Sequence, residues 1–225
     1  MVRSDGGSAA NEIIVTGGHV GTHIDALAHV SQDGLLHGGV TPESIQSNLG
    51  FSELGIETVE PIVCRGVMLD IAALHGVDML DGGYEVSVED LEKSASRQSV
   101  EVTSGDAVLI RTGWSRHWPN PVAFIGTDNG TPGPGEAAAR WLSDHGIKLA
   151  GAETIAFEVI APARGHAVLP AHRILLVEAG IHIIEVMDLS GLAASGVSEF
   201  LFVASPLKLV GATGSPIRPI ALIDD

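Results

Sequence analysis

Residues 17–30, GGHVGTHIDALAHV, hold four side chains that can bind a metal ion or carry a proton: His19, His23, Asp25 and His29. All four positions are odd-numbered, and alternate side chains of an extended segment point to one face. A helix would bring the first two histidines together but would turn the aspartate away from them. Because Gly21 permits a sharp bend, we expect an extended segment followed by a short helix over residues 26–28. Asp25 would cap that helix, and His29 would lie one turn in.

This density of potential ligands is typical of a metal site more than of isolated surface histidines. Two imidazoles and one carboxylate form the ligand set of an open divalent site, which suits Mn²⁺, Zn²⁺ or Fe²⁺ and leaves positions for water. The pKa of a bound water can fall to about 7, which produces a nucleophile at neutral pH. The stretch therefore predicts metal-assisted chemistry, with His29 as the base if it is not itself a ligand.

A second group of candidate residues lies in AHRILLVEAGIHIIEVMDL, residues 171–189. His172 is expected to start a helix that stops at Gly180, and Glu185 lies on the strand that follows. A helix and the next strand lie side by side when a tight turn joins them, so the two side chains could converge. The isolated histidines at 75, 117, 145 and 182 are expected to be structural, and His37 is expected to be a solvated loop residue.

The composition describes a globular chain with one domain over residues 1–225. It is 45% hydrophobic and 18% charged, and its length is one that a single sheet-based domain commonly reaches. The net charge of −16 would repel phosphate and anionic lipid, so we expect no nucleic-acid partner and no membrane partner. The single cysteine, Cys64, excludes an internal disulfide and a zinc site built on thiolates. No segment approaches the roughly 18 consecutive apolar residues of a membrane span, and we expect a cytoplasmic protein.

Short apolar or β-branched runs between turn residues predict strands, and fewer segments predict helices. The expected strands are residues 13–15, 66–71, 107–111, 147–150, 181–186, 200–203 and 217–223. The expected helices are 87–98, which a capping box of Ser87 and Asp90 opens, 136–145 and 171–179. Residues 118–135 are expected to form the longest loop. This mixed order favours an α/β or α+β sheet domain over a strictly doubly wound sheet.

HVGTHIDALAH, residues 19–29, resembles the signature HxGTHxDxxxH of the cyclase family of metal-dependent hydrolases. The match is complete, and three later features follow in family-like order: GVMLDIAAL at 66–74, RTGW at 111–114, and the pair His172 and Glu185. The resemblance implies an α/β fold, the family's swivelling β/β/α domain with a central barrel-like mixed sheet and flanking helices. It also implies a homodimer or a higher homo-oligomer.

The resemblance also implies a role for each candidate residue. The first metal, Mn²⁺ or alternatively Zn²⁺, would be bound by His19, His23 and Asp25. His29 would be the catalytic base. His172 and Glu185 would help to hold a second metal, or would shape the site of a mononuclear enzyme.

Leu27 and the segment VSQDGLLHGG at 30–39 make the chain most similar to the family branch that hydrolyses isatin. The implied function is metal-dependent hydrolysis of a cyclic amide, isatin to isatinate, with a small aromatic amide as the substrate. N-formylkynurenine formamidase activity is an alternative, because both substrates carry an amide attached to an aryl ring. From another class, His23 and Asp25 with a distant histidine imitate the facial triad of non-haem iron oxygenases.

Two further expectations concern the walls of the pocket. Family members carry several tens of residues before the signature and this chain carries 18, so an inactive, N-terminally shortened relative is another alternative. Trp114, Trp118 and Phe124 could stack on an aromatic substrate, although packing in the core would explain them equally well.

Overall fold

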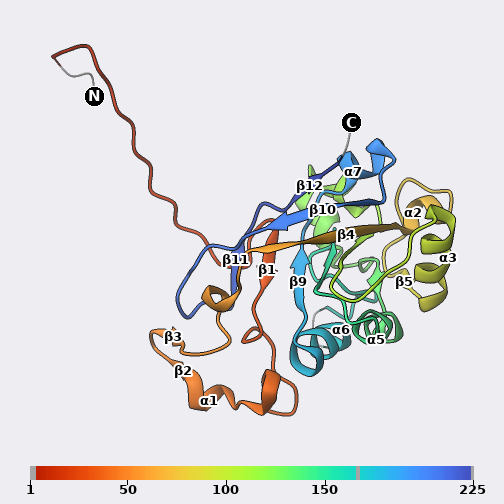
Figure 1. Cartoon of the computed structure of the whole chain (residues 1–225), viewed down its shortest axis with the longest axis horizontal. Helices are drawn as coiled ribbons and strands as arrows, with labels where there is room; N and C mark the ends of the chain where they lie inside the picture. Colours follow the sequence, from red (N-terminus) through yellow and green to blue (C-terminus); the bar gives the residue numbers. More distant parts are fainter. Residues whose placement is uncertain (1–3, 166–167, 224–225) are drawn as a thin grey trace.

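A strongly curled sheet of eight strands dominates the structure, a computed structural model that describes residues 4–165 and 168–223 (Figure 1). The strand order is β11-β1-β9-β8-β6-β4-β10-β12. The strands are β1 (His23–Asp25), β4 (Ile62–Asp70), β6 (Ala107–Arg111), β8 (Leu149–Ala152), β9 (His182–Glu185), β10 (Glu199–Ala204), β11 (Gly214–Pro216) and β12 (Ile220–Leu222). The sheet forms a half-barrel with helices beside it, which confirms the predicted α/β class and its barrel-like mixed sheet.

The middle of the sheet is parallel and its flanks are antiparallel. β4, β6, β8 and β9 pair in parallel, which is the arrangement expected of apolar strands covered on both faces. β1 pairs antiparallel with both β9 and β11, and β10 pairs antiparallel with both β4 and β12. Each flank therefore returns the chain beside the parallel core, and β1 from the start of the chain lies next to β9 from its last third.

Helices cover one face of this sheet (Figure 1). They are α2 (Ile71–Leu74), α3 (Val88–Gln98), α5 (Glu136–Asp144) and α6 (Pro170–His172), which continues into a π-helical turn at Arg173–Ala179. One buried cluster joins Leu91, Leu142 and Leu175 of these helices to alternate residues of the strands, such as Val108. A second cluster, which includes Leu109 and Phe202, fills the inner face of the curl. The central strands β6 and β8 are therefore buried on both faces, whereas the edge strand β12 is exposed.

Shorter elements complete the described chain. They are α1 (Pro42–Ile45), α4 (Pro121–Ile125), α7 (Ser190–Ser195), the strand pairs β2 (Gln46–Ser47) with β3 (Gly50–Phe51) and β5 (Glu85–Val86) with β7 (Gly133–Pro134), and the 3₁₀ turns His37–Gly39, Ile56–Thr58 and Trp114–His117. Over the described residues, every helix is too short or too polar to cross a bilayer.

The predicted helix ends are confirmed where local chemistry determines them. The Ser87 side chain accepts a hydrogen bond from the Asp90 amide, and the Asp90 carboxylate accepts one from the Ser87 amide, so the capping box is complete. Gly146 and Gly180 follow the next two helical segments with φ values of 64° and 69°. Glycine adopts this left-handed conformation without a Cβ clash, and both helices stop there.

Three local predictions are wrong. Residues 13–15 do not form a strand but lie in an extended, fully exposed arm of residues 4–17, because these residues have no strand ladder to join. No helix forms at residues 26–28: Asp25 ends β1, and a turn follows in which the His29 amide donates to the Ala26 carbonyl at 3.0 Å. Residues 118–135 are not one long loop, because α4 and β7 form within them.

Candidate metal centre

The register of β1 places the signature side chains. His23 and Asp25 project from one face of this strand, while Ile24 between them packs into the core inside the curl. His23 lies directly opposite Glu185 at the end of β9. The predicted one-sided arrangement therefore arises on a strand of only three residues, and it brings a carboxylate from the far end of the chain to the signature.

His19, His23 and Asp25 form a group whose possible ligand atoms all lie within 4.8 Å of one another. His19 Nδ1 is 2.9 Å from Asp25 Oδ1, and His23 Nε2 is 3.6 Å from the same oxygen. The His23 Nδ1–H donates to the Gly21 carbonyl at 2.8 Å, and His19 Nε2 pairs with the Thr213 hydroxyl at 3.0 Å. These outer bonds orient both rings, so that Nε2 of His23 and Nδ1 of His19 face the carboxylate.

The unpaired polar atoms of this cluster fit a cation. His19 Nδ1, both carboxylate oxygens of Asp25 and Glu185 Oε1 are buried without a hydrogen-bond partner among the described residues. The 2.9 Å contact between His19 and Asp25 brings the atoms close, but its angles do not form a hydrogen bond. Buried polar groups are rarely left unpaired, and lone pairs that converge on one point are what a divalent ion requires.

The charge of Asp25 is maintained by its histidine neighbours. Burial opposes ionisation, but the imidazoles of His19 and His29 hold the pKa of the Asp25 carboxyl below its ordinary value. Because this side chain is fully buried, its negative charge needs a positive partner. The electrostatics therefore agree with a ligand that remains ionised.

His172 approaches the other oxygen of Asp25. Its Nε2 lies 3.7 Å from Asp25 Oδ2 and 3.1 Å from Glu185 Oε1, so the predicted convergence of His172 and Glu185 occurs. Asp25, His29 and His172 form a second group of possible ligands within 4.8 Å. Burial lowers the pKa of His172, but the carboxylates of Glu158 and Glu185 outweigh it and raise this pKa to about 10. A cation bound here would have to displace the proton from Nε2, because a ligating imidazole is neutral.

His29 lies at the exposed side of the cluster. Its ring stacks on His19, with 4.0 Å between centroids, and lies 6.3 Å from His172. The protein around the ring lowers the pKa of His29 below its ordinary value, although the negative charge of Asp25 opposes this shift. A neutral imidazole at the edge of a metal cluster can accept a proton at neutral pH.

A cavity of about 870 Å³ opens beside these histidines. Its other walls are mostly apolar and include Trp118, Phe124, Ile125 and Leu169. Trp114 is not a wall residue: it is buried, and its indole N–H donates to the Phe124 carbonyl at 2.8 Å. Of the three aromatic candidates, Trp118 and Phe124 line the cavity, and Trp114 holds the backbone behind Phe124.

The isolated histidines take the structural roles expected of them. His75 pairs with Asp90 at 2.8 Å, and the rings of His145 and His182 hydrogen-bond to the carbonyls of Trp141 and Asp25. His117 packs edge-on against the Trp114 ring. His37 is half-buried rather than solvated, because its Nδ1 bonds to the Val177 carbonyl at 2.9 Å.

Sequence analysis missed Glu158. This buried carboxylate lies 2.7 Å from His172 Nδ1, the ring nitrogen that points away from Asp25 and Glu185. Its sequence surroundings, Ala156-Phe157-Glu158-Val159-Ile160, contain the only available signal, which is a charge inside an apolar run. Charged residues are seldom fully buried without a partner, so such a glutamate indicates a buried hydrogen-bonding network.

Comparisons with known proteins agree with this geometry. The family model described as "Putative cyclase" matches residues 5–159. An isatin hydrolase from Roseibium aggregatum is 27% identical over 231 residues, which cover 98% of this chain and 77% of that protein. A crystal structure of a novel cyclase is 34% identical with a TM-score of 0.80, covering 90% of this chain and 69% of its own. A potential metal-dependent hydrolase with cyclase activity is 26% identical with a TM-score of 0.59, covering 91% and 79%.

Proposed function

Because this chain belongs to the cyclase family, whose relatives include hydrolases, we propose that it is a metal-dependent hydrolase that opens a cyclic amide, isatin, to isatinate. The observation that carries the proposal is the group of buried, unpaired ligand atoms of His19, Asp25 and Glu185 at the wall of an apolar cavity. Similarity to an isatin hydrolase supports the choice of substrate.

The residues that would hold the cation are His19, His23 and Asp25. We propose Mn²⁺, with Zn²⁺ as the alternative, because imidazole and carboxylate ligands suit both ions. When bound, such an ion polarises a carbonyl group and lowers the pKa of coordinated water. His172 approaches the second oxygen of Asp25, and Glu185 lies between His23 and His172, with Oε2 3.2 Å from His23 Nε2 and Oε1 3.1 Å from His172 Nε2. These two residues could hold a second ion or shape the first site.

His29 is proposed as the group that moves the proton. Its pKa is lowered, so the ring is neutral at neutral pH and can take a proton from the attacking water. The same proton then goes to the amide nitrogen as the bond between carbonyl carbon and nitrogen breaks. One imidazole thus serves as base and then as acid, and the new carboxyl group releases the second proton of the water to solvent as isatinate forms.

The cavity wall suits an aromatic amide. Trp118 and Phe124 present aromatic surface close to the histidines, and Leu169 adds an aliphatic contact. Aromatic rings gain binding energy from burial and from offset or edge-to-face contacts of about 0.5–1.5 kcal/mol beyond it. N-formylkynurenine also carries an aryl-attached amide and is the alternative substrate.

The test compares both substrates on protein that is first treated with a chelator and then loaded with one ion. We expect isatin opening, followed by absorbance, to require Mn²⁺ or Zn²⁺ and to proceed equally well without oxygen. Deformylation of N-formylkynurenine as the faster reaction would change the assigned substrate. Oxygen consumption with added Fe²⁺ would support an oxygenase, and an ion-loaded protein that turns over neither amide would contradict the hydrolase proposal.

A further inference from the structure

The side chain of His172 is held from behind by Glu158. Glu158 Oε1 accepts hydrogen bonds from His172 Nδ1 at 2.7 Å and from the His172 amide at 2.9 Å. Its Oε2 accepts a bond from the Ala171 amide at 2.9 Å. Glu158 and His172 are 1% and 2% exposed, so water does not compete for these contacts. The carboxylate accepts three hydrogen bonds, and its geometry lets only one ring nitrogen of His172, Nδ1, face it.

We propose that Glu158 is a positioning residue that acts through His172. It holds a proton on Nδ1 and turns Nε2 toward Asp25 and Glu185, where that atom helps to define the cation site. A carboxylate bonded to the far nitrogen of a ligating histidine fixes the ring's orientation and raises its basicity. The inference rests on the proposed function to the extent that the cluster must bind a cation.

The backbone before Glu158 supplies an independent indication. Phe157 is fully buried and has a φ of 56°, a left-handed conformation that is unfavourable for a bulky residue. The Thr154 hydroxyl donates to the Phe157 carbonyl at 3.3 Å, and a Cβ at Gly133 would collide with the same carbonyl. Conformations of this kind persist where the surrounding structure imposes them, and they cluster at functional sites. Here the strained turn aims Glu158 at His172.

A purely structural role would have different consequences. Glu158 also anchors the backbone of Ala171 and His172, so its loss would destabilise the start of α6 whether or not a cation binds. A positioning role requires in addition that its loss alters the tautomer of His172 and the affinity for the ion. The experiment therefore measures stability, tautomer and cation affinity separately.

The variant is Glu158→Gln, which keeps the side-chain size and removes the charge. We expect Mn²⁺ affinity, measured by calorimetric titration, to fall about 10- to 100-fold. In the Zn²⁺-loaded protein, where a ligating His172 must be neutral, we expect the ¹⁵N resonances of its ring to lose the signature of an Nδ1–H tautomer. The matched control is Glu153→Gln, since Glu153 is equally buried but bonds to the amides of Thr112 and Gly113. The control should lose stability yet bind Mn²⁺ within about twofold of the wild type.

If Glu158→Gln folds poorly, Glu158→Asp, which keeps the charge and shortens the side chain, takes its place, and a double-mutant cycle tests the coupling to His172. In a His172→Gln background, the added Glu158→Gln change should have little further effect on Mn²⁺ affinity, because the two residues act as one unit. Unchanged affinity in the single variant, an unchanged His172 spectrum, or additive effects in the cycle would overturn the inference. Hydrolysis is a separate readout: a wild type that binds Mn²⁺ but opens no amide contradicts the proposed function and leaves this result standing.

Discussion

Asp25 is the residue that both groups of possible ligands share. Its Oδ1 faces His19 and His23, its Oδ2 faces His172, and the side chain is fully buried. A buried carboxylate is costly unless several positive or donor groups surround it, and histidines supply them from two sides. Its substitution is therefore the sharpest test of where the ion binds.

Replacing Asp25 with asparagine keeps its shape and removes its charge. We expect the ion content of the purified protein to fall to about a tenth or less, because the two histidines that remain lack the anionic ligand. Elemental analysis measures this directly. Asp144→Asn, at the exposed end of α5, is the control and should retain its ion. Equal ion content in the Asp25 variant would mean that the ligands have been misassigned.

Replacing His29 with alanine tests proton transfer apart from ion binding. We expect kcat to fall about 10²- to 10⁴-fold, which is the usual effect of losing a positioned acid or base, while Mn²⁺ affinity changes little. In the wild type, protonation should reduce kcat only below the ordinary histidine range, because the pKa of His29 is lowered. His37→Ala, outside the cavity, is the control. Full activity in the His29 variant would remove this residue from the mechanism.

Two short elements create the cluster. β1 is a three-residue strand whose antiparallel register places His23 opposite Glu185. His172 closes α6 at the point where a π-helical turn begins. π-helical turns are frequent at functional sites, because the extra residue shifts side chains from the regular helical positions. The site therefore forms where the three-residue strand β1 approaches the end of α6, at which the π-helical turn begins.

The capping box of α3 gives a prediction about stability. Burial opposes ionisation of Asp90, but hydrogen bonds from Ser87 and His75 lower the pKa of its carboxyl. A lowered folded-state pKa stabilises the protein above the unfolded-state pKa of about 3.9, and this contribution is lost as pH falls through the folded-state value. Ser87→Ala should lower the free energy of unfolding by about 0.5–2 kcal/mol at pH 7.

Urea denaturation at pH 7 and near pH 3 measures both effects. The difference between Ser87→Ala and the wild type should begin to shrink at the lower pH, because the unfolded chain is protonated at Asp90 there and the charged carboxylate no longer adds its full stability to the folded state. Ser195→Ala, whose hydroxyl bonds locally at the end of α7, is the control and should show no such pH dependence. A difference that stays constant with pH would contradict the coupling between the cap and the Asp90 charge.

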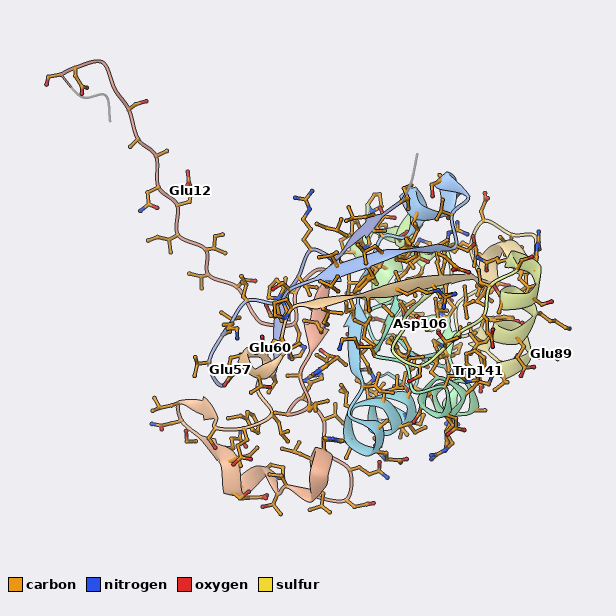
Figure 2. All side chains as sticks on the ribbon, in the orientation of Figure 1. Glu12, Glu57, Glu60, Glu89, Asp106 and Trp141 are labelled. Atoms are coloured by element: carbon orange, nitrogen blue, oxygen red, sulfur yellow. The ribbon has the colours of Figure 1, made fainter. Side chains whose placement is uncertain are left out.

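The N-terminal arm extends away from the sheet and helices. Figure 2 shows Glu12 on this arm, distant from the rest of the chain. Ile13, Ile14 and Val15 are 90%, 85% and 93% exposed, although β-branched residues favour strands and burial. Three adjacent exposed aliphatic side chains are unusual on a monomer's surface. We therefore propose that the arm packs against a second copy of the chain in a homodimer or higher oligomer.

A charge placed in the arm tests this proposal. Ile14→Asp should lower the mass measured by light scattering toward that of one 23.3 kDa chain, since a buried charge would weaken the contact. Thr16→Asp adds the same charge to the same arm and should change the mass much less, because it removes no aliphatic surface. A wild-type protein that is monomeric at micromolar concentration would contradict the proposal.

The amino-acid sequence alone predicts the local features of the structure, which depend on residues close together in the chain. The spacing of two between His23 and Asp25 puts both on one face of a strand, the Ser87–Asp90 pair starts α3, and Gly180 stops the segment after His172. These features depend on backbone periodicity and on hydrogen bonds between residues a few positions apart. The resemblance of residues 19–29 to the family signature also predicted the family and its barrel-like sheet. The family model confirms the first, and the structure confirms the second.

Folding decides which distant residues meet. Ile13–Val15 has strand propensity but no ladder, whereas β1 has only three residues and lies between two strands from the last third of the chain. Glu158 reaches His172 through a turn in which Phe157 adopts an unfavourable φ, and no local period encodes such a contact. The physical reason is that strand pairing and buried polar contacts gain their free energy from partners remote in sequence, and those partners exist only once the sheet has closed around them.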